Sequence, residues 1–273
     1  MKSLLRWAGS KRQLLGNLQE YWDAANADRY VEPFAGSAAL FFEIAPKTAV
    51  LNDVNAELIG FYRGIKRSTA LVYELASSLA VDETTYYEVR RNYPYETDPI
   101  RRSANFYYLN RYCFNGIYRT NATGQFNVPF AKDRVGRFPA WDDVEASVRQ
   151  LRKASTHNRD FESLVQSDVA ERDFVYLDPP YAVENQRIFT QYNASTFGLT
   201  DLDRLQATLE KIHSRGASFV LSYAFCEEAK SYFSRWNHRQ VQCQRNVAGF
   251  AKHRRKAVEL MITNIDLPEA TND

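Results

Sequence analysis

Residues 174–181 have the sequence Phe174-Val175-Tyr176-Leu177-Asp178-Pro179-Pro180-Tyr181, which joins a predicted strand to polar and aromatic groups at its end. The run 174–177 is short, apolar and partly β-branched, as is typical of a buried strand. The two prolines end the strand because neither can donate a backbone hydrogen bond, and each favours extended geometry in the residue before it. We therefore expect Asp178 and Pro179 at the carboxyl end of a strand, where open α/β sheets bind their ligands.

These groups suit reaction at an aromatic amine such as adenine N6. The lone pair of such an amine is delocalised into the ring, so attack requires the nitrogen to pyramidalise and gain positive charge. An ionised Asp178 and the carbonyl of Pro179 can accept its two N–H groups and stabilise that charge. Tyr181 can stack on the base, as side chains of base-flipping enzymes do. The alternative is a strand that ends in a turn with a surface tyrosine, and the other motifs decide between the two.

Length and composition indicate a globular protein with one large domain or two smaller ones. The chain has 273 residues, of which 45% are hydrophobic and 25% charged, as in ordinary globular proteins. Charges at Lys2 and Arg6 interrupt any signal-peptide core, and no apolar stretch reaches membrane length, so we expect a cytoplasmic protein without a membrane partner. Cys113, Cys226 and Cys243 form no CxxC pattern or His cluster, which predicts reduced thiols and no metal site.

Positive charge is concentrated in two regions, although the net charge is only +2. Residues 235–256 contain seven Lys or Arg and no acid, and residues 90–137 contain nine against three acids. Any single charged run is commonly a solvated face. Two basic regions interleaved with aromatic residues and Asn favour a polyanionic partner instead, and nucleic acid is the first candidate.

The first third of the chain contains the features of a nucleotide site. Ser10 is expected to cap a helix, with Lys11 beside it as a partner for a carboxylate. A short strand at 29–32 precedes the small-residue turn at Gly36 and a helix to about Ile44. A second strand at 48–51 is followed by Asp53, 17 residues after Gly36 (53 − 36). That spacing is close to the one expected for an acid that binds ribose hydroxyls, so the sequence predicts an adenosine-containing cofactor.

Residues 56–151 interrupt the α/β alternation, and we predict that they form an inserted second domain. Their pattern is mainly helical, except for residues 110–130, where Asn, Gly and Arg predict a loop and hairpin with turns at Gly116 and Gly124. The α/β pattern then resumes. It predicts a strand end at 158–161, a helix capped by Thr200, a strand at 217–223, a helix at 226–236, and strands at 240–246 and 257–264 joined by an exposed basic turn at 249–255.

The order of these motifs resembles that of the Dam family of adenine-N6 DNA methyltransferases, alpha group. The matching segments are WAGSK at 7–11, VEPFAGSAAL at 31–40, LNDVNAELI at 51–59, the block at 110–130, RDF at 159–161 and DPPY at 178–181. The resemblance extends from Trp7 to Leu260. WAGSK and DPPY in this order, with a long insertion between them, are specific together.

The resemblance implies S-adenosylmethionine as methyl donor and a Rossmann-like α/β methyltransferase domain at 1–55 and 152–273. Residues 56–151 would be the inserted helical DNA-recognition domain with its β-hairpin. Matching positions would place in the donor pocket Trp7, Ala8, Lys11, Glu32, Phe34, Gly36, Asp53, Asp160, Phe161 and Asp178. The flipped adenine would be contacted by Asp178, Pro179 and Tyr181.

The resemblance also implies a reading head for GATC in double-stranded DNA. In the family the central block supplies an intercalating pair, an apolar contact to thymine and an arginine that recognises guanine. The matching residues are Phe114 and Asn115, Ile117, Arg119 and Pro129. From the basic turn we expect Arg254 and Arg255 to contact phosphates. Two departures stand out: Ala38 is expected to crowd the donor slightly, and Leu221–Phe225 lacks the family's Ser-Asn pair, so Tyr223 receives no role.

Several alternatives stay open at this point. Cytosine N4 is a similar aromatic amine, but the motif order argues against it, and the large basic insertion argues against RNA or protein substrates. A related enzyme that recognises a longer site beginning with GAT, and a catalytically impaired DNA-binding relative, also remain. We expect a monomer. The sequence does not distinguish a role in repair, restriction-modification or phage defence, nor does it indicate processivity or a preference for hemimethylated DNA.

Overall fold

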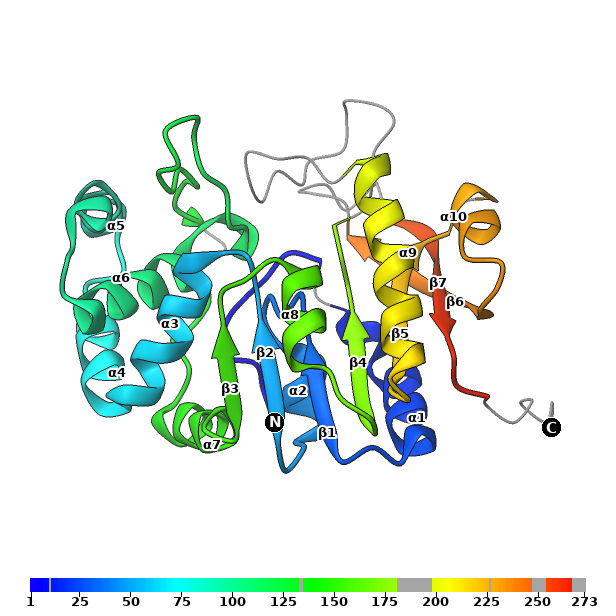
Figure 1. Cartoon of the computed structure of the whole chain (residues 1–273). Coiled ribbons are helices and arrows are strands. Elements are labelled where there is room, and N and C mark those ends of the chain that lie inside the picture. The colour runs from blue at the N-terminus through cyan, green and yellow to red at the C-terminus, as the bar shows by residue number, and fades with distance from the viewer. Residues whose placement is uncertain (10, 133–134, 181–197, 226, 247–253, 267–273) are drawn as a thin grey trace.

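The structure is a computed structural model, and it describes residues 1–9, 11–132, 135–180, 198–225, 227–246 and 254–266 (Figure 1). Within these residues seven strands form one sheet in the order β3-β2-β1-β4-β5-β7-β6. The parallel strands are β1 (Arg29–Glu32), β2 (Ala49–Asn52), β3 (Ala154–His157), β4 (Asp173–Leu177) and β5 (Ser218–Ala224). β7 (Arg254–Thr263) is antiparallel to both β5 and β6 (Asn237–Asn246). The predicted α/β class is confirmed.

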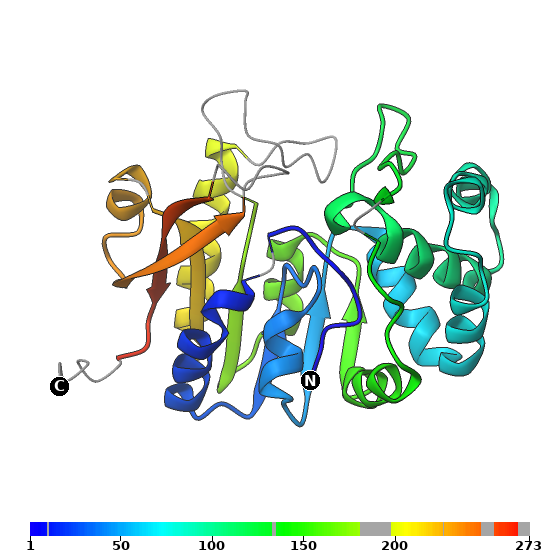
Figure 2. The ribbon, with the colours of Figure 1, turned by 180° about the vertical axis from the view of Figure 1, so that it is seen from behind.

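Helices cover the sheet on both faces. α8 (Phe161–Asp168) and α9 (Leu199–Ser214) lie on the face seen in Figure 1. α1 (Leu15–Ala25) and α2 (Ala39–Ile44) lie on the other face (Figure 2). All five residues of β4 are therefore buried, which explains why this strand is continuously apolar after Asp173 rather than alternating. A shorter helix, α10 (Glu227–Tyr232), follows β5.

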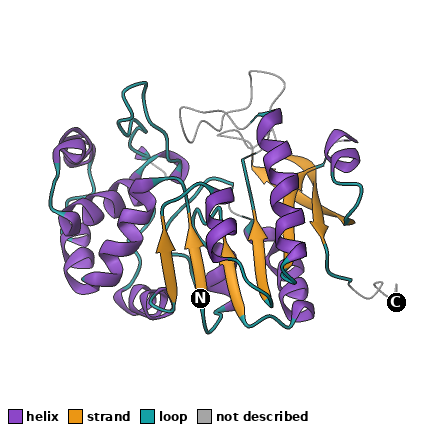
Figure 3. Cartoon of the chain, viewed as in Figure 1, coloured by secondary structure: helices purple, strands orange, loops and turns teal. Residues whose placement is uncertain are grey.

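A group of helices lies beside the β3 side of the sheet (Figure 3). It consists of α3 (Ala56–Arg67), α4 (Thr69–Ser77), α5 (Glu83–Asn92), α6 (Pro99–Tyr112) and α7 (Trp141–Leu151). Side-chain caps explain where three of them begin, because Asn55, Asp82 and Asp98 each accept a backbone N–H from the first turn that follows. Short 3₁₀ turns occur at Arg12–Leu14, Tyr93–Tyr95 and Phe114–Gly116.

One cluster of buried side chains continues from the sheet into these helices. It includes Tyr30 and Phe174 from the strands and Phe61 and Tyr107 from the helices. The N-terminal segment also joins the two parts, since the backbone of Arg6 donates to and accepts from the Asn110 side chain at 3.0 and 2.7 Å. The division into domains at residues 55 and 151 remains a prediction, because the packing is continuous across it.

The loop and hairpin predicted after α6 are present. Residues Cys113 and Phe130 pair across its base, and Thr120 pairs with Phe126 nearer its tip. The tip is closed by Asn121, whose side chain accepts the backbone N–H groups of Thr123 and Gln125. We call residues 113–130 the recognition hairpin after the role predicted for them. The hairpin extends towards the side to which the parallel strands point (Figure 1).

Several predicted boundaries were wrong. α9 is capped by Gly198 rather than Thr200, because the Asp201 carboxylate accepts the Gly198 N–H at 2.9 Å. Arg254 and Arg255 begin β7 and pair with Asn246 and Arg245, so neither belongs to a turn. The rest of the expected basic turn (249–253) and the predicted cap Ser10 lie outside the described residues.

No helix in the described ranges has the length and apolar character required to cross a bilayer. Among the same residues, no group of His, Cys, Asp and Glu side chains is arranged to hold a metal ion.

Candidate active site

Four acidic side chains lie at or just beyond the carboxyl ends of neighbouring strands of the sheet. Asp160 comes after β3, Asp53 directly follows β2, Glu32 ends β1, and Asp178 directly follows β4. We call these four residues the acid row. Because the strands are parallel and adjacent in the order β3-β2-β1-β4, the acid row runs across the sheet in that same order.

The acid row borders an open cavity of about 290 Å³. All ten residues expected in the donor pocket line this cavity: Trp7, Ala8, Lys11, Glu32, Phe34, Gly36, Asp53, Asp160, Phe161 and Asp178. Pro179 lines it as well, whereas Tyr181 lies outside the described residues. Arg159, Asp201 and Arg204 also line it and were not predicted. The structure thus brings together segments that are up to 197 residues apart in the sequence (204 − 7), from Trp7 to Arg204.

The turn after β1 needs a glycine. Gly36 has a φ of +47°, and a Cβ atom there would lie 2.9 Å from Cδ1 of Trp7. Its N–H donates to Asp53 Oδ2 at 3.0 Å, and Asp53 Oδ1 accepts the Asn55 N–H at 2.9 Å. Burial raises the pKa of Asp53, while these two hydrogen bonds lower it. The turn therefore holds the Asp53 carboxylate in one orientation beside the cavity.

Ala38 does not crowd this cavity as expected. Its side chain is fully buried, and it is not one of the lining residues, although its neighbours Ser37 and Ala39 are. It adopts a left-handed backbone conformation (φ 51°) at the start of α2. The alanine therefore affects the backbone of the turn rather than the space for a ligand.

Glu32 presents an unsatisfied acceptor. Its side chain is 3% exposed, and among the described residues Oε2 has no hydrogen-bond partner. Its pKa is raised well above the ordinary value, mainly because burial disfavours the charge and partly because Asp178 and Asp53 are also negative. A buried carboxyl oxygen without a partner is costly, so this position suits a ligand that brings a donor or a positive charge.

Asp178 is held by two side chains from different parts of the chain, Lys11 and Ser222. Lys11 Nζ lies 2.8 Å from its Oδ1, and the Ser222 hydroxyl donates to the same oxygen at 3.1 Å. Tyr176 lies within hydrogen-bond distance of Ser222, at 3.2 Å. The pKa of Asp178 is raised by burial and by Glu259, and it is lowered by Lys11 and Ser222. Both of these contacts use Oδ1 rather than Oδ2.

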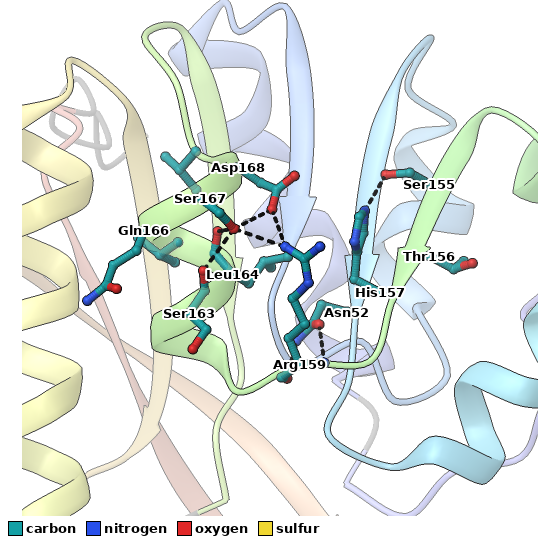
Figure 4. Close-up of polar contacts among 12 residues, drawn as sticks. Asn52, Ser155, Thr156, His157, Arg159, Ser163, Leu164, Gln166, Ser167 and Asp168 are labelled. Atoms are coloured by element: carbon teal, nitrogen blue, oxygen red, sulfur yellow. Dashed lines mark hydrogen bonds and ion pairs between the residues drawn. The ribbon is translucent and has the colours of Figure 1, made fainter.

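The connection from β3 to Asp160 is fixed by a small polar network (Figure 4). Arg159 Nη1 donates to Ser167 Oγ and to Asp168 Oδ2, each at 3.0 Å. The Arg159 backbone N–H donates to Asn52 Oδ1, also at 3.0 Å. Asp160 then caps α8 by accepting the Glu162 N–H. These contacts join the ends of β2 and β3 and set the position of the next acid in the row.

The residues expected to contact DNA bases lie together, apart from the acid row. Phe114 and Asn115 form the 3₁₀ turn at the base of the recognition hairpin, and the Phe114 N–H donates to the Pro129 carbonyl at 2.9 Å. Ile117 follows that turn. Arg119 is exposed and its Nε donates to Asn127 Oδ1 at 2.8 Å. None of these five residues lines the cavity.

The hairpin and the cavity are joined by stacked rings. Trp7, which lines the cavity, stacks on Tyr118 with ring centroids 5.8 Å apart and planes 18° apart. Tyr118 also packs on Phe126 of the hairpin at 5.6 Å. The sequence analysis assigned no role to Tyr118, because its contact with Trp7 is formed only in the folded chain.

Comparison with known proteins agrees with this geometry. Residues 7–247 match the family described as D12 class N6 adenine-specific DNA methyltransferases. The chain belongs to this family. The resemblance to Dam-like enzymes is thereby confirmed, and the protein is a site-specific adenine DNA methyltransferase that acts at N6 rather than at cytosine N4.

Three similar proteins match over nearly their whole length. The type II methyltransferase M1.LlaDCHI of Lactococcus lactis subsp. cremoris is 31% identical over 273 residues, which cover 97% of this chain and 95% of the relative. The type II methyltransferase M.MjaIII of Methanocaldococcus jannaschii is 30% identical, with 97% and 99% covered. The DNA adenine methylase of Escherichia coli K12 is 29% identical, with 95% and 94% covered.

Proposed function

We propose that this methyltransferase uses S-adenosylmethionine to methylate adenine N6 within GATC sites of double-stranded DNA, after the adenine has left the duplex. The observation that carries the proposal is the position of Asp178 at one end of the acid row, beside the cavity. An acid at that place can contact a substrate amine while the rest of the row contacts a donor. The family fixes the reaction class, and the donor, the site and the residue roles are our inference.

The acid row matches the donor in length and charge. Four adjacent strands span three spacings of about 4.8 Å, or roughly 14 Å, which is comparable to an extended adenosine joined to an amino acid. The Asp53 carboxylate is suited to accept hydrogen bonds from ribose hydroxyls. The Phe161 ring is suited to pack on a purine, and the Asp160 carboxylate to accept a hydrogen bond from its amine. Glu32, with its unpaired oxygen, suits a cationic group. When bound, the donor supplies a methyl group on a sulfonium that leaves as a neutral thioether.

Asp178 and Pro179 would then act on the target amine. As N6 pyramidalises, its two N–H groups can be accepted by Asp178 Oδ2 and by the Pro179 carbonyl. The carboxylate stabilises the positive charge that develops on nitrogen, which is an interaction stronger in the transition state than in the ground state. Ser222 and Lys11 hold Oδ1, so the carboxylate is already oriented before the substrate arrives. Tyr181 is proposed to stack on the flipped base.

The recognition hairpin would supply sequence recognition. Phe114 and Asn115 are suited to fill the stack that the adenine leaves. Arg119 offers a planar fork for O6 and N7 of guanine, and Ile117 and Pro129 offer apolar surface for the thymine methyl. In the described structure Arg119 is exposed and contacts Asn127, so it is accessible to a base without losing a buried partner.

Two measurements test the proposal. The gene is expressed in a host without adenine methylation, and the DNA is sequenced with detection of methylation at single-base resolution. We expect N6-methyladenine in GATC; methylation at a longer site beginning with GAT would correct the fourth base, and sites without GAT would refute the proposed hairpin contacts.

The second measurement concerns Asp178. In D178N and D178A we expect loss of nearly all methyl transfer in a folded protein, because one stabiliser of this kind contributes about 3–4 kcal/mol to the transition state. D28N is the matched control, since Asp28 pairs with Arg172 at the opposite edge of the sheet. Transfer by D178A above about a tenth of the wild-type rate would contradict the assignment.

A further inference from the structure

Arg204 connects two helices at the β3 end of the cavity. Its guanidinium uses a different nitrogen for each of three carboxylates. Nε donates to Glu162 at 3.0 Å, Nη1 to Asp201 at 3.0 Å, and Nη2 to Asp160 Oδ1 at 2.6 Å. The same guanidinium lies over the Phe161 ring, 4.7 Å from its centroid. Arg204 therefore contacts Asp160, which ends the acid row on this side, and also the next residue, Phe161.

These contacts leave a defined acceptor in the cavity. Asp160 Oδ1 receives the Glu162 N–H and Arg204 Nη2, so Oδ2 is the oxygen that remains available. Phe161 is also packed on Phe34, with ring centroids 5.1 Å apart. Because a guanidinium is planar and donates in fixed directions, it restrains the carboxylate plane and the ring more tightly than a point charge would.

The same cation also fixes the start of α9. Asp201, which accepts from Arg204, accepts the Gly198 N–H through its other oxygen. Arg204, Asp160, Phe161 and Asp201 all line the cavity. The first turn of α9 and the first turn of α8 are thus held together by one side chain, on the face of the sheet shown in Figure 1.

We propose that Arg204 is a positioning residue for the base end of the donor pocket. It orients Asp160 so that Oδ2 accepts the exocyclic amine of the donor's adenine, and it holds Phe161 against the face of that base. This inference rests on the proposed donor. Arg204 would thereby help the pocket to select adenosine. In an analogue of the methyl donor that carries an oxo group in place of the amine, Asp160 Oδ2 would face a hydrogen-bond acceptor instead of an N–H group.

Binding of two probes to the purified full-length protein, without DNA, tests this role. The probes are S-adenosylhomocysteine and S-inosylhomocysteine, which differ in the replacement of the amine by an oxo group, and binding is measured by titration calorimetry. The variants are R204M, which keeps the length without the charge, and R204K, which keeps the charge without the fork. R235M is the matched control, since Arg235 also pairs with a glutamate and lies over an aromatic ring, Trp236, away from the cavity.

The wild-type protein is expected to prefer the adenosyl probe. In R204M we expect this preference to shrink about tenfold, the size of one weakened charge-assisted hydrogen bond, and in R204K to shrink less, while R235M retains it. Equal weakening of both probes, or an unchanged preference in R204M and R204K, would overturn the role of Arg204. If R204M does not fold, R204K alone decides. A wild-type protein that binds neither probe would instead refute the proposed donor, and the inference with it.

Discussion

At the scale of single residues, the environment of Asp178 sets the pH at which it can work. The carboxylate must be ionised to stabilise positive charge on the amine, yet burial and Glu259 raise its pKa. Lys11 opposes both effects through its charge and its contact at 2.8 Å. Lys11 therefore keeps the functional form of Asp178 populated at lower pH than the site would otherwise allow.

This leads to a prediction for K11M. Loss of the ammonium removes an interaction that lowers the pKa of Asp178, so the pKa rises further. The acid limb of kcat/KM for DNA, measured at saturating donor, is then expected to move to higher pH than in the wild type. K2M is the control, because Lys2 pairs with Asp143 in an exposed contact of 3.3 Å. An acid limb that stays in place would show that Lys11 does not govern the titration.

Residue-scale prediction from the sequence depended on local signals. Asp53 and Asp178 could be selected because each follows an apolar strand pattern, and Asp160 could be selected through the RDF motif of the family resemblance. The structure places all three around one cavity. Arg204 and Ser222 could not, since each contacts its acid across 44 residues of chain. No periodicity in the sequence encodes such tertiary contacts.

At the scale of elements, the recognition hairpin depends on how its base is attached. Gly116 has a φ of +64°, and a Cβ atom there would lie 2.5 Å from Cβ of Arg6. Gly124, at the tip, has a φ of +78° but nothing within 4 Å of the position of a Cβ. A side chain at either position would strain the backbone, but only a side chain at Gly116 would also clash with the N-terminal segment.

G116A and G124A use this difference. Both variants force alanine into a left-handed conformation, which costs about 1–2 kcal/mol. Only G116A adds a clash, so we expect it to lower the free energy of unfolding by at least about 1 kcal/mol more than G124A, as measured by urea denaturation. Equal effects would mean that the Arg6 contact relaxes without cost.

The same hairpin provides a test of base recognition. R119A removes the fork proposed to contact guanine, and we expect a loss of about 1–3 kcal/mol of discrimination at that base pair while non-specific binding persists. Competition binding with single-base variants of GATC measures it. An R119A enzyme with unchanged base preference would place recognition in other residues.

Elements were predicted best where the hydrophobic pattern was strong. β1, β2 and β4 are central strands whose buried runs are visible in the sequence. Helix α5 was not predicted individually, because it is mostly polar and only Tyr86 is buried. The start of α9 was misplaced because threonine is at least as favourable an N-cap residue type as glycine. The contact between the Gly198 N–H and Asp201, which sets the start of the helix, forms only in the folded turn.

At the scale of the whole molecule, the charge distribution differs from the one expected from sequence alone. Of the seven basic residues in 235–256, Arg235 pairs with Glu210 and Arg239 pairs with Glu20, each at 2.6 Å. Acids from distant parts of the chain thus neutralise part of the surplus. Counting charges along the sequence could not show this, because the partners are brought together only by the fold.

The remaining basic residues of this region lead to a prediction about DNA affinity. We expect R254A/R255A to weaken binding to all duplexes alike and to reduce the slope of log affinity against log salt by about one unit per lost phosphate contact. R235A/R239A is the matched control: it removes two arginines from the same region that already pair with glutamates, so its slope should stay close to that of the wild type. Filter binding or anisotropy with GATC and non-specific duplexes, over a range of salt concentrations, measures both. Unchanged affinity of R254A/R255A at low salt would mean that these two arginines are solvated and that DNA is held by other parts of the surface.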